Sequence, residues 1–514
     1  MDMEIASQRQ DGASVNRAKR REWIGLAILT LPCLIYSMDL TVLNLAVPAL
    51  SVALEPTATQ LLWILDVYGF FLAGMLITMG ALGDRIGRRR LLMSGAAAFG
   101  VTSIIASLSN SPQVLILARA VLGVAGATLA PATLSLIRTL FHDAHERRIA
   151  ISVWTAGFSA GAAIGPLIGG VLLQYFWWGS VLLVALPVMV LLLVLGPRFL
   201  PEYRSQSSGE VDIASAALSL TAVLGPVYGL KRAAEYGIDV TSVSCMTVGL
   251  VLGALFVRRQ FRLESPMIDL KLFRSRSFST ALAIYVLGSF VMFGSFMFIS
   301  QYIQLVLGLD PRAAGLWSLP FGLVFILGSI LTPVIARNLR NSTVIILGLL
   351  VAIAGFSLLS RVDQTTSPKV LCAICCTYYL GLACVFTLIT DAIVGGVSPD
   401  QAGAASSVSE TGSELGGALG IAVLGSIGTA VYRAFLGHSG SLAHDFKTST
   451  VAAAVREARH VGGLLGSALL QASRSAFVEA LHTAAIVSIG ILGVAIVLAV
   501  RGLDPPVPVD DESN

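Results

Sequence analysis

Fourteen apolar segments, each long enough to cross the ~30 Å hydrocarbon core of a bilayer, run through this chain of 514 residues. Because lipid offers no hydrogen-bond partners, a segment that crosses it alone must bond its own backbone, as a helix does. Charged residues make up 12% of the chain, against about 25% in soluble proteins. We therefore expect an all-α membrane protein with 14 transmembrane helices. The segments lie approximately at residues 23–49, 61–82, 91–109, 113–136, 149–173, 179–197, 212–230, 240–257, 278–303, 313–335, 342–360, 370–394, 404–431 and 476–500.

The positions of Lys and Arg predict the orientation of these segments. If the N-terminus is inside and the segments alternate, 23 of the 34 basic residues lie in inside segments and 10 in outside segments, with Arg119 inside a span. Five of the outer ten fall in one long loop after residue 431, where the positive-inside rule is weaker. We therefore expect a multi-pass protein of the plasma (cytoplasmic) membrane with both termini cytoplasmic. The first segment lacks a small-residue cleavage site and is too long for a signal peptide, so it should be retained.

Polar links predict the domain organisation. "LGPRFLPEYRSQSSGEVD" and "VRRQFRLESPMIDLKLFRSRS" separate two blocks of six spans from an extra pair of spans. The long outside loop contains "VAAAVREARHVGGLLGSALLQASRSAF", which has the spacing of an amphipathic helix. The expected parts are a basic cytoplasmic N-terminus (1–22), an N-terminal six-helix bundle (23–200), a linker with two extra helices (201–277), a C-terminal six-helix bundle (278–500) that includes an extracytoplasmic loop (432–475), and an acidic cytoplasmic tail (501–514).

Composition argues against several kinds of site. The basic residues sit in short loops between apolar runs, so we expect no nucleic-acid partner. All six cysteines fall inside apolar runs, and "CAICC" has no second pair of Cys or His residues near it. We interpret them as packing residues rather than a metal or redox centre. No metal and no cofactor is expected.

The loop between the second and third segments, "GALGDRIGRRR", combines glycines with charges. Its glycines, Gly80 and Gly87 among them, allow two helix ends to approach closely. Asp84 can accept bonds from backbone N–H groups and from Arg88, which follows Arg85 in the motif. The alternative is an ordinary basic cytoplasmic loop, although the order of Gly, Asp and Arg favours a defined turn.

This order resembles the signature loop of the major facilitator superfamily, G-x-L-x-D-R-x-G-R-R, and the resemblance extends over residues 20–500. It implies the major facilitator fold, two six-helix bundles with two extra central helices here, and a transporter rather than an enzyme. It also implies that Asp84 and Arg88 form a latch that stabilises the outward-facing state. The corresponding loop of the second half, "ARNLRNS", has neither Asp nor Gly.

The fifth segment contains "SAGAAIGPLIGGVLL", in which Gly161, Gly165 and Gly169 recur every four residues, with Pro166 and Gly170 beside them. Such a stripe of small residues lets another helix pack, or rock, at close range, and the proline bends the helix. A static packing seam is the alternative. G-x-x-x-G-P-x-x-G-G resembles the motif that antiporters of the superfamily carry in this span, which implies antiport.

Three ionisable residues lie at nearly one depth if helices rise 1.5 Å per residue. They are Asp39 in the first segment, Asp66 in the second and Arg119 in the fourth, and they can pair if their helices face one cavity. Asp66 has an alternative role as a snorkelling interfacial residue, beside Trp63 and Tyr68.

Two of these positions carry resemblances of their own. Asp39 and Thr41 in "MDLTVLNLAVPAL" resemble the first-span motif of fourteen-span drug/proton antiporters. Arg119 with Gly123 resembles the fourth-span motif of the superfamily, in which the arginine is implicated in proton transfer.

Two glutamates, Glu410 and Glu414, stand in "SSVSETGSELGGALG", where the thirteenth segment begins. A charge at mid-bilayer costs about 3 kcal/mol on insertion scales, so the presence of two acids in this segment requires an explanation. One alternative starts the helix near Leu415, so that both would cap a cytoplasmic N-terminus. We prefer a wet cavity, because Ser, Thr and Gly surround them, and the segment resembles that of quaternary-ammonium efflux pumps. Asp391 is a weaker candidate, with a helix-end role as its alternative.

Aromatic residues in the spans could line an adaptable pocket for such cations. The candidates are Tyr36, Trp63, Tyr68, Phe158, Phe290 and Trp317. Each taken alone is more often ordinary packing.

Together these features predict a proton-coupled multidrug efflux antiporter that exports lipophilic cations such as quaternary ammonium compounds and dyes. The tenth segment has no carboxylate, so we expect mainly monovalent cations. The proton gradient would drive transport, and the protein should act in the bilayer as a monomer. The alternatives are an exporter of a metabolite or lipid with the same fold and a polytopic membrane enzyme. Arg119 as the sole basic residue expected in a span argues against an anion carrier, and no D-D-x-x-D or nucleotide-binding motif appears.

Overall fold

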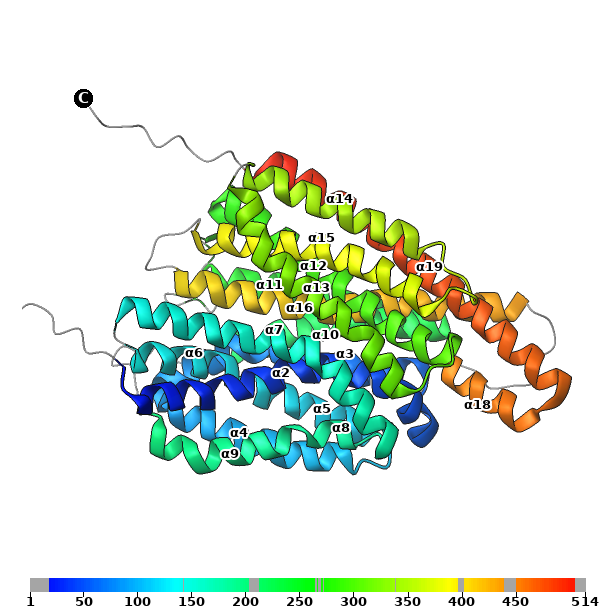
Figure 1. The fold of residues 1–514 in the computed structure, drawn as a ribbon, viewed down its shortest axis with the longest axis horizontal. Coiled ribbons are helices and arrows are strands. Elements are labelled where there is room, and N and C mark those ends of the chain that lie inside the picture. The colour runs from blue at the N-terminus through cyan, green and yellow to red at the C-terminus, as the bar shows by residue number, and fades with distance from the viewer. Residues whose placement is uncertain are drawn as a thin grey trace, which may run out of the picture.

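The computed structural model is all-helical in the part of the chain that it describes, which comprises residues 18–141, 143–202, 212–263, 266, 270, 272–337, 339–395, 402–438 and 450–503 (Figure 1). Fourteen of its helices are long and apolar enough to cross a membrane, which confirms the expected count. The chain is therefore a multi-pass membrane protein. Helix α2 begins, and helix α19 ends, at the same end of the molecule.

The first six spans form the N-terminal half, by which we mean α2 to α9. Thr57 and Gln60 make a capping box that starts α3, and Ser111 caps α5. The fourth and sixth spans are each divided into two consecutive helices. The helices of this half are α2 (Arg20–Leu54), α3 (Ala58–Ile86), α4 (Arg88–Ser107), α5 (Pro112–Gly126), α6 (Leu129–Leu140), α7 (Ala144–Tyr175), α8 (Ser180–Leu183) and α9 (Ala185–Phe199).

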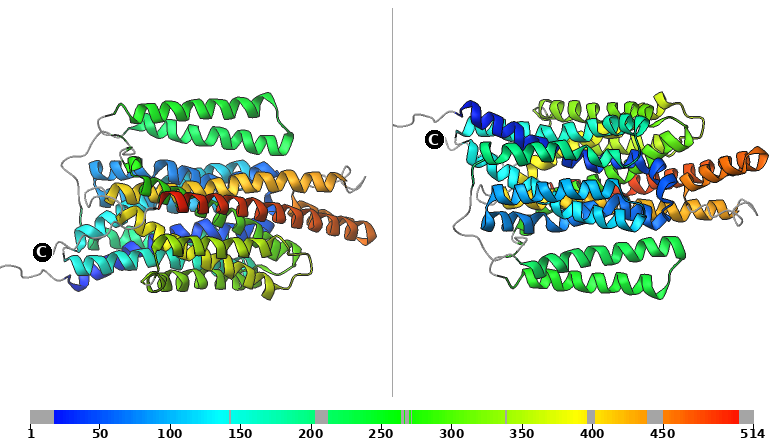
Figure 2. Two further views of the ribbon diagram at one scale, coloured as in Figure 1. Left: turned by 90° about the horizontal axis from the view of Figure 1, so that it is seen from above. Right: turned by 90° about the horizontal axis from the view of Figure 1, so that it is seen from below.

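The two extra helices, α10 (Ile213–Tyr236) and α11 (Val240–Gln260), pair as a hairpin. Asp212 caps α10 and binds Arg259 of α11, while Asp239 caps α11 and binds Arg232 of α10. Although partial burial works against it, hydrogen bonds from Arg259 and Ser215 lower the pKa of Asp212 to about 2. The hairpin is central in the sequence but peripheral in space: Figure 2 shows it as an outer layer beside α3 and α16.

The C-terminal half, by which we mean α12 to α19, differs from the expected boundaries at two places. Helix α16 begins at Ala402, close to the expected residue 404, but it extends to His438 rather than ending near residue 431, and α19 begins at Gly463 rather than near residue 476. Much of the expected loop 432–475 is therefore helical, and its residues 439–449 lie outside the described part. The helices are α12 (Arg276–Gln301), a π-helical turn η2 (Tyr302–Val306), α13 (Pro311–Ala336), α14 (Asn341–Leu359), α15 (Pro368–Gly395), α16 (Ala402–His438), α18 (Val451–Val461) and α19 (Gly463–Gly502).

Helix α7 packs on two neighbours, one in each half. A Cβ built on Gly161 would lie 2.2 Å from the carbonyl oxygen of Leu34 in α2, so the two backbones touch. Its opposite face meets α13, where a Cβ on Gly315 would lie 2.4 Å from the carbonyl oxygen of Pro166. The glycine stripe thus holds α7 against its own half, and the Pro166 face borders the other half.

One end of the boundary between the halves is closed by hydrogen bonds. Ser300 Oγ donates to the carbonyl of Asn44 at 3.2 Å, and Gln304 Nε2 donates to the carbonyl of Leu45 at 3.0 Å. Arg456 of α18 forms an ion pair with Glu55 after α2. These bonds join the C-terminal end of α2 to the C-terminal half.

Candidate substrate and proton site

Asp39 and Arg119 form a buried ion pair between α2 and α5. The guanidinium is 1% exposed, and its Nε donates to the carbonyl of Ile64 at 3.2 Å. It also lies 4.6 Å from the centroid of the Tyr68 ring, within cation–π range. The structure therefore brings together two of the three ionisable residues predicted to share one level. Helix α3 contributes the carbonyl of Ile64 and the ring of Tyr68 to the surroundings of the arginine.

Asp66, the third of these residues, is paired with a lysine that sequence reasoning missed. Lys231 Nζ of α10 lies 2.8 Å from Oδ1 and 2.7 Å from Oδ2 of Asp66, and neither side chain is exposed. Nζ also lies 3.7 Å from the centroid of the Trp63 ring. The snorkelling alternative for Asp66 is therefore wrong, because a snorkelling side chain reaches water.

Arg119 is likewise not the sole basic residue inside a span. The seventh span extends to Tyr236 rather than to residue 230, so Lys231 lies within it. The charge of Lys231 is neutralised by Asp66, so this second basic residue does not by itself favour an anion carrier.

Glu410 and Glu414 lie inside the thirteenth span. Because α16 begins at Ala402, eight residues before Glu410, the interpretation of both acids as caps on a helix that starts near Leu415 is wrong. Glu414 is 9% exposed, and Glu410 is half-buried. Neither carboxyl forms an ion pair with a basic residue in the described part of the chain.

The surroundings of the two glutamates come from both halves. Glu414 lies within electrostatic range of the hydroxyl of Tyr36 on α2, and both acids lie within range of Tyr285 on α12. Ser413 Oγ, between them in sequence, is 2.9 Å from Ser289 Oγ of α12. The acids therefore occupy the boundary at which the two halves meet.

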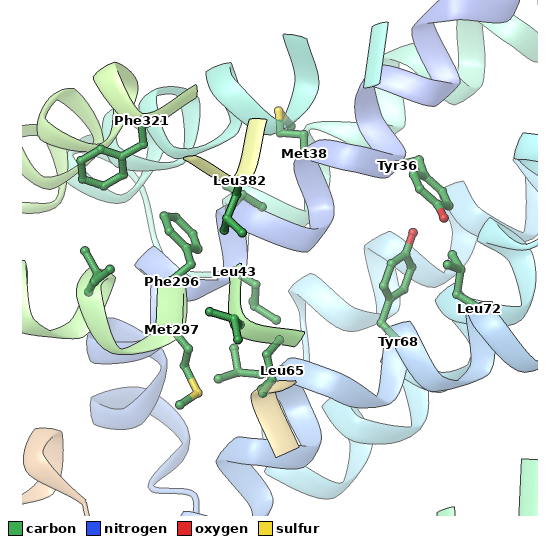
Figure 3. Close-up of a cluster of buried hydrophobic side chains, with 14 of the residues drawn as sticks. Tyr36, Met38, Leu43, Leu65, Tyr68, Leu72, Phe296, Met297, Phe321 and Leu382 are labelled. Atoms are coloured by element: carbon green, nitrogen blue, oxygen red, sulfur yellow. The ribbon is translucent and has the colours of Figure 1, made fainter. Parts of the chain in front are cut away.

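Tyr36 and Tyr68 point their hydroxyl groups toward one another between α2 and α3 (Figure 3). Both side chains are buried; the Tyr68 hydroxyl lacks a hydrogen-bond partner in the described structure, and the Tyr36 hydroxyl lies beside the carboxyl of Glu414. Phe158 packs edge-on against Tyr36, with 5.4 Å between ring centroids. Buried unpaired hydroxyls are uncommon and suit a site that water or a ligand fills.

The other predicted pocket aromatics make no ring contact with Tyr36, Tyr68 or Phe158 in the part of the chain that the structure describes. Trp63 faces Lys231 and Tyr228 at the edge of α10. Phe290 and Trp317 are half-buried on α12 and α13. Asp391 is exposed near the end of α15.

The loop of the signature motif is a tight turn. Gly87 has a φ of +112°, a conformation that suits glycine, and it joins α3 directly to α4. Gly80 faces Pro131 of α6, and Arg85 is exposed. The side chain of Asp84 lies outside the described residues, so its pairing with Arg88 stays a prediction.

The next arginines of the motif hold the end of the sixth span. The backbone N–H of Arg89 donates to Glu202 Oε1 at 3.2 Å, and the side chains of Arg89 and Arg90 lie 3.6 Å and 3.7 Å from Glu202 Oε2.

The described residues contain no group of three or more His, Cys, Asp or Glu side chains that could hold a metal ion. The six cysteines form no disulfide bond in the structure.

Comparison with known proteins decides the family. Residues 30–421 match the sequence profile of the Major Facilitator Superfamily. The chain belongs to the major facilitator superfamily. This transporter is 41% identical to the multidrug efflux pump LfrA of Mycolicibacterium smegmatis over 492 residues, which cover 95% of this chain and 97% of that protein.

Further relatives agree with this assignment. The transporter is 33% identical to the methyl viologen resistance protein SmvA of Salmonella typhimurium, over 91% of this chain and 96% of that protein. Among solved structures, a bacterial homologue of the human lysosomal transporter Spinster, in an inward-facing and unoccupied conformation, superimposes with a TM-score of 0.67. The identity is 17%, and the match covers 96% of this chain and 100% of that chain, so it shows the shared fold. The transporter is therefore a homologue of multidrug efflux pumps, and the predicted fold and family are confirmed.

Proposed function

We propose that this transporter is a proton-coupled antiporter that exports lipophilic, mainly monovalent cations, and that Glu410 and Glu414 bind either protons or the cation. The observation that carries the proposal is a pair of span carboxyl groups without a basic partner in the described chain, at the boundary between the halves. The relatives named for multidrug efflux and for methyl viologen resistance support lipophilic cations as the class of substrate. The preference for monovalent cations rests instead on the tenth span, which contains no carboxylate.

The chemistry follows from burial. A low-dielectric surrounding disfavours the charged form of a carboxyl, so an isolated buried glutamate gains either a proton or a cationic ligand. Both compete for the same oxygen atoms. Aromatic faces such as those of Tyr36 and Tyr285 attract the positive charge of a lipophilic cation.

The direction of transport requires the two halves to alternate. Protons arriving from outside would displace the cation outward, and loss of those protons inside would restore the binding site. We assign Asp39 and Arg119 to the same machinery, because their buried pair lies beside Tyr68, which is within electrostatic range of Glu414 across the boundary.

We propose the remaining features of the organisation on the same grounds. The chain would comprise two six-helix bundles (23–200 and 278–500) joined by the two extra helices, and it would act as a monomer. The bias of Lys and Arg toward alternate loops supports cytoplasmic termini.

The test is transport in inverted membrane vesicles, whose cytoplasmic face is outward. An acid interior should drive accumulation of ethidium, and Glu410→Gln should abolish the part that depends on the proton gradient, because glutamine cannot exchange a proton. A C-terminal tag should be cleaved by added protease in the same vesicles if the termini are cytoplasmic.

Glu479→Gln is the matched control, since this glutamate is 46% exposed on α19 and lies beside His482. It should transport as the parent does. Gradient-driven accumulation that survives in Glu410→Gln removes this residue from the role, and absence of accumulation in the parent refutes proton antiport of this cation. Methyl viologen is a dication, so comparing its rate of accumulation with that of ethidium in the same assay measures the preference for singly charged substrates.

A further inference from the structure

The buried lysine of α10 has its counter-ion and an aromatic neighbour on α3. Its ammonium group donates a hydrogen bond to Oδ1 of Asp66, lies 2.7 Å from Oδ2 and stacks on the face of Trp63, and the side chain is fully buried. A charge removed from water is stable only with a counter-ion and well-formed hydrogen bonds. Lys231 and Asp66 therefore act as each other's counter-ion, although Oδ2 of Asp66 makes no hydrogen bond in the described structure.

A second polar contact joins the same two helices one turn away. Glu235 Oε2 accepts a hydrogen bond from the backbone N–H of Thr59, in the first turn of α3, at 3.1 Å. Leu220 lies against Gly74 at the other end of α10, so close that a Cβ on that glycine would be 2.4 Å from Leu220 Cδ2. Helix α10 is thus fixed to α3 along its length.

The contact of α10 with α16 is of a different kind. Val227 joins Phe70 of α3 and two alanines of α16, Ala418 and Ala422, in a small buried apolar cluster separate from the main core. In the described part of the chain, the ion pairs and side-chain hydrogen bonds that α10 makes with other helices go to α3 or α11. Leucines of α16 and further apolar side chains of α10 pack around this cluster, so the contact is apolar and contains no directional bond.

We propose that Lys231 is a positioning residue: it is the fixed counter-ion of Asp66, and the pair makes the α10–α11 hairpin travel with α3 while α16 slides past it during turnover. This rests on the proposed alternation of the two halves. It assigns Asp66 to the anchoring of the hairpin instead of to substrate or proton binding.

The first experiment removes the charges singly and together. Lys231→Met and Asp66→Asn each leave one buried charge without a partner, so each should lower ethidium turnover about tenfold or more, with the apparent KM within about twofold, and lower thermal stability in detergent. The double variant removes both charges and should recover both properties to near the parent values. Lys369→Met with Asp310→Asn, two residues at helix starts away from this pair, is the control.

The result that overturns the proposal is a folded, thermally stable double variant that is as inactive as Asp66→Asn, since Asp66 would then act in transport itself. Failure of recovery in both stability and turnover also overturns it. If the parent protein shows no proton-driven transport, the proposed function fails, yet the stability of the same variants still decides the ion pair.

The second experiment tests the motion with reversible cross-links in an active cysteine-free background. A disulfide between Gly74→Cys and Leu220→Cys joins α3 to α10 and should leave turnover within about twofold, because these helices move together. A short thiosulfonate cross-link between Val227→Cys and Ala418→Cys joins α10 to α16 and should stop turnover until it is reduced. Normal turnover with the second link, or arrest by the first, contradicts the proposal.

Discussion

Asp39 and Asp66 are both buried aspartates with one basic partner, yet those partners come from different parts of the fold. Arg119 approaches Asp39 from within the N-terminal half, and its guanidinium lies over the ring of Tyr68. Lys231 approaches Asp66 from the peripheral hairpin. The two pairs look alike as charges, but only the first lies beside Tyr68, which is within electrostatic range of Glu414.

This difference predicts different outcomes when each pair is neutralised. Asp39→Asn leaves the Arg119 guanidinium buried without a counter-ion, which should destabilise the protein by about 3–5 kcal/mol and stop transport. Combining it with Arg119→Gln should recover thermal stability but not proton-driven ethidium transport, because the proposed transport machinery is still missing.

Melting of the purified variants and vesicle transport measure the two quantities separately. Asp310→Asn is the control, since asparagine caps a helix as well as aspartate does. Full transport by the double variant would move Asp39 and Arg119 out of the mechanism and into a structural role.

At the residue scale, the burial of the ionisable groups was easier to predict from the sequence than the pairs that these groups form. Counting the rise along helices placed Asp39, Asp66 and Arg119 near one level. The partner of Asp66 was missed because the seventh segment was ended at residue 230, directly before a lysine taken as a loop charge. Local hydropathy treats every Lys as a terminator, whereas a counter-ion on another helix can hold one inside a span.

At the scale of elements, α7 shows how one helix serves two contacts. Its glycine stripe meets α2 of the same half, and the face of Pro166 and Gly170 meets α13 of the other half. The repeat of four residues identifies a close-packed face but contains no information on which helix lies opposite. Boundaries were the weakest predictions, because α16 and α19 continue past the ends of their hydrophobic runs.

A bulky residue in the stripe should separate α7 from α2. A Cβ at Gly165 would lie 2.5 Å from Thr41 Oγ1 and 2.9 Å from Met38 Cγ, so Gly165→Leu overpacks the seam at a cost of about 1–3 kcal/mol. We expect a variant that inserts into the membrane, melts at a lower temperature and transports ethidium poorly.

Gly493→Leu is the matched control, because nothing lies within 4 Å of a Cβ at that glycine. Equal transport by the two variants would contradict the requirement for close packing between α2 and α7.

At the scale of the whole molecule, the halves meet around a small group of polar residues in an apolar body. Bonds from Ser300 and Gln304 close one end of that boundary, while Glu410 and Glu414 lie farther along it on α16. The all-helical membrane architecture was predictable because only helices and closed barrels cross a bilayer, and the major facilitator fold was implied by the resemblance of the loop at residues 80–90. The site depended on tertiary contacts between halves, which a linear pattern does not contain.

The most direct test of the account is release of protons from purified protein in detergent when substrate is added. Weakly buffered protein near neutral pH should acidify the solution on addition of ethidium, Glu410→Gln and Glu414→Gln should each release fewer protons, and Glu479→Gln should match the parent. Binding of ethidium with no proton release by the parent, or equal release by all four proteins, would contradict the exchange of a cation for protons at these glutamates.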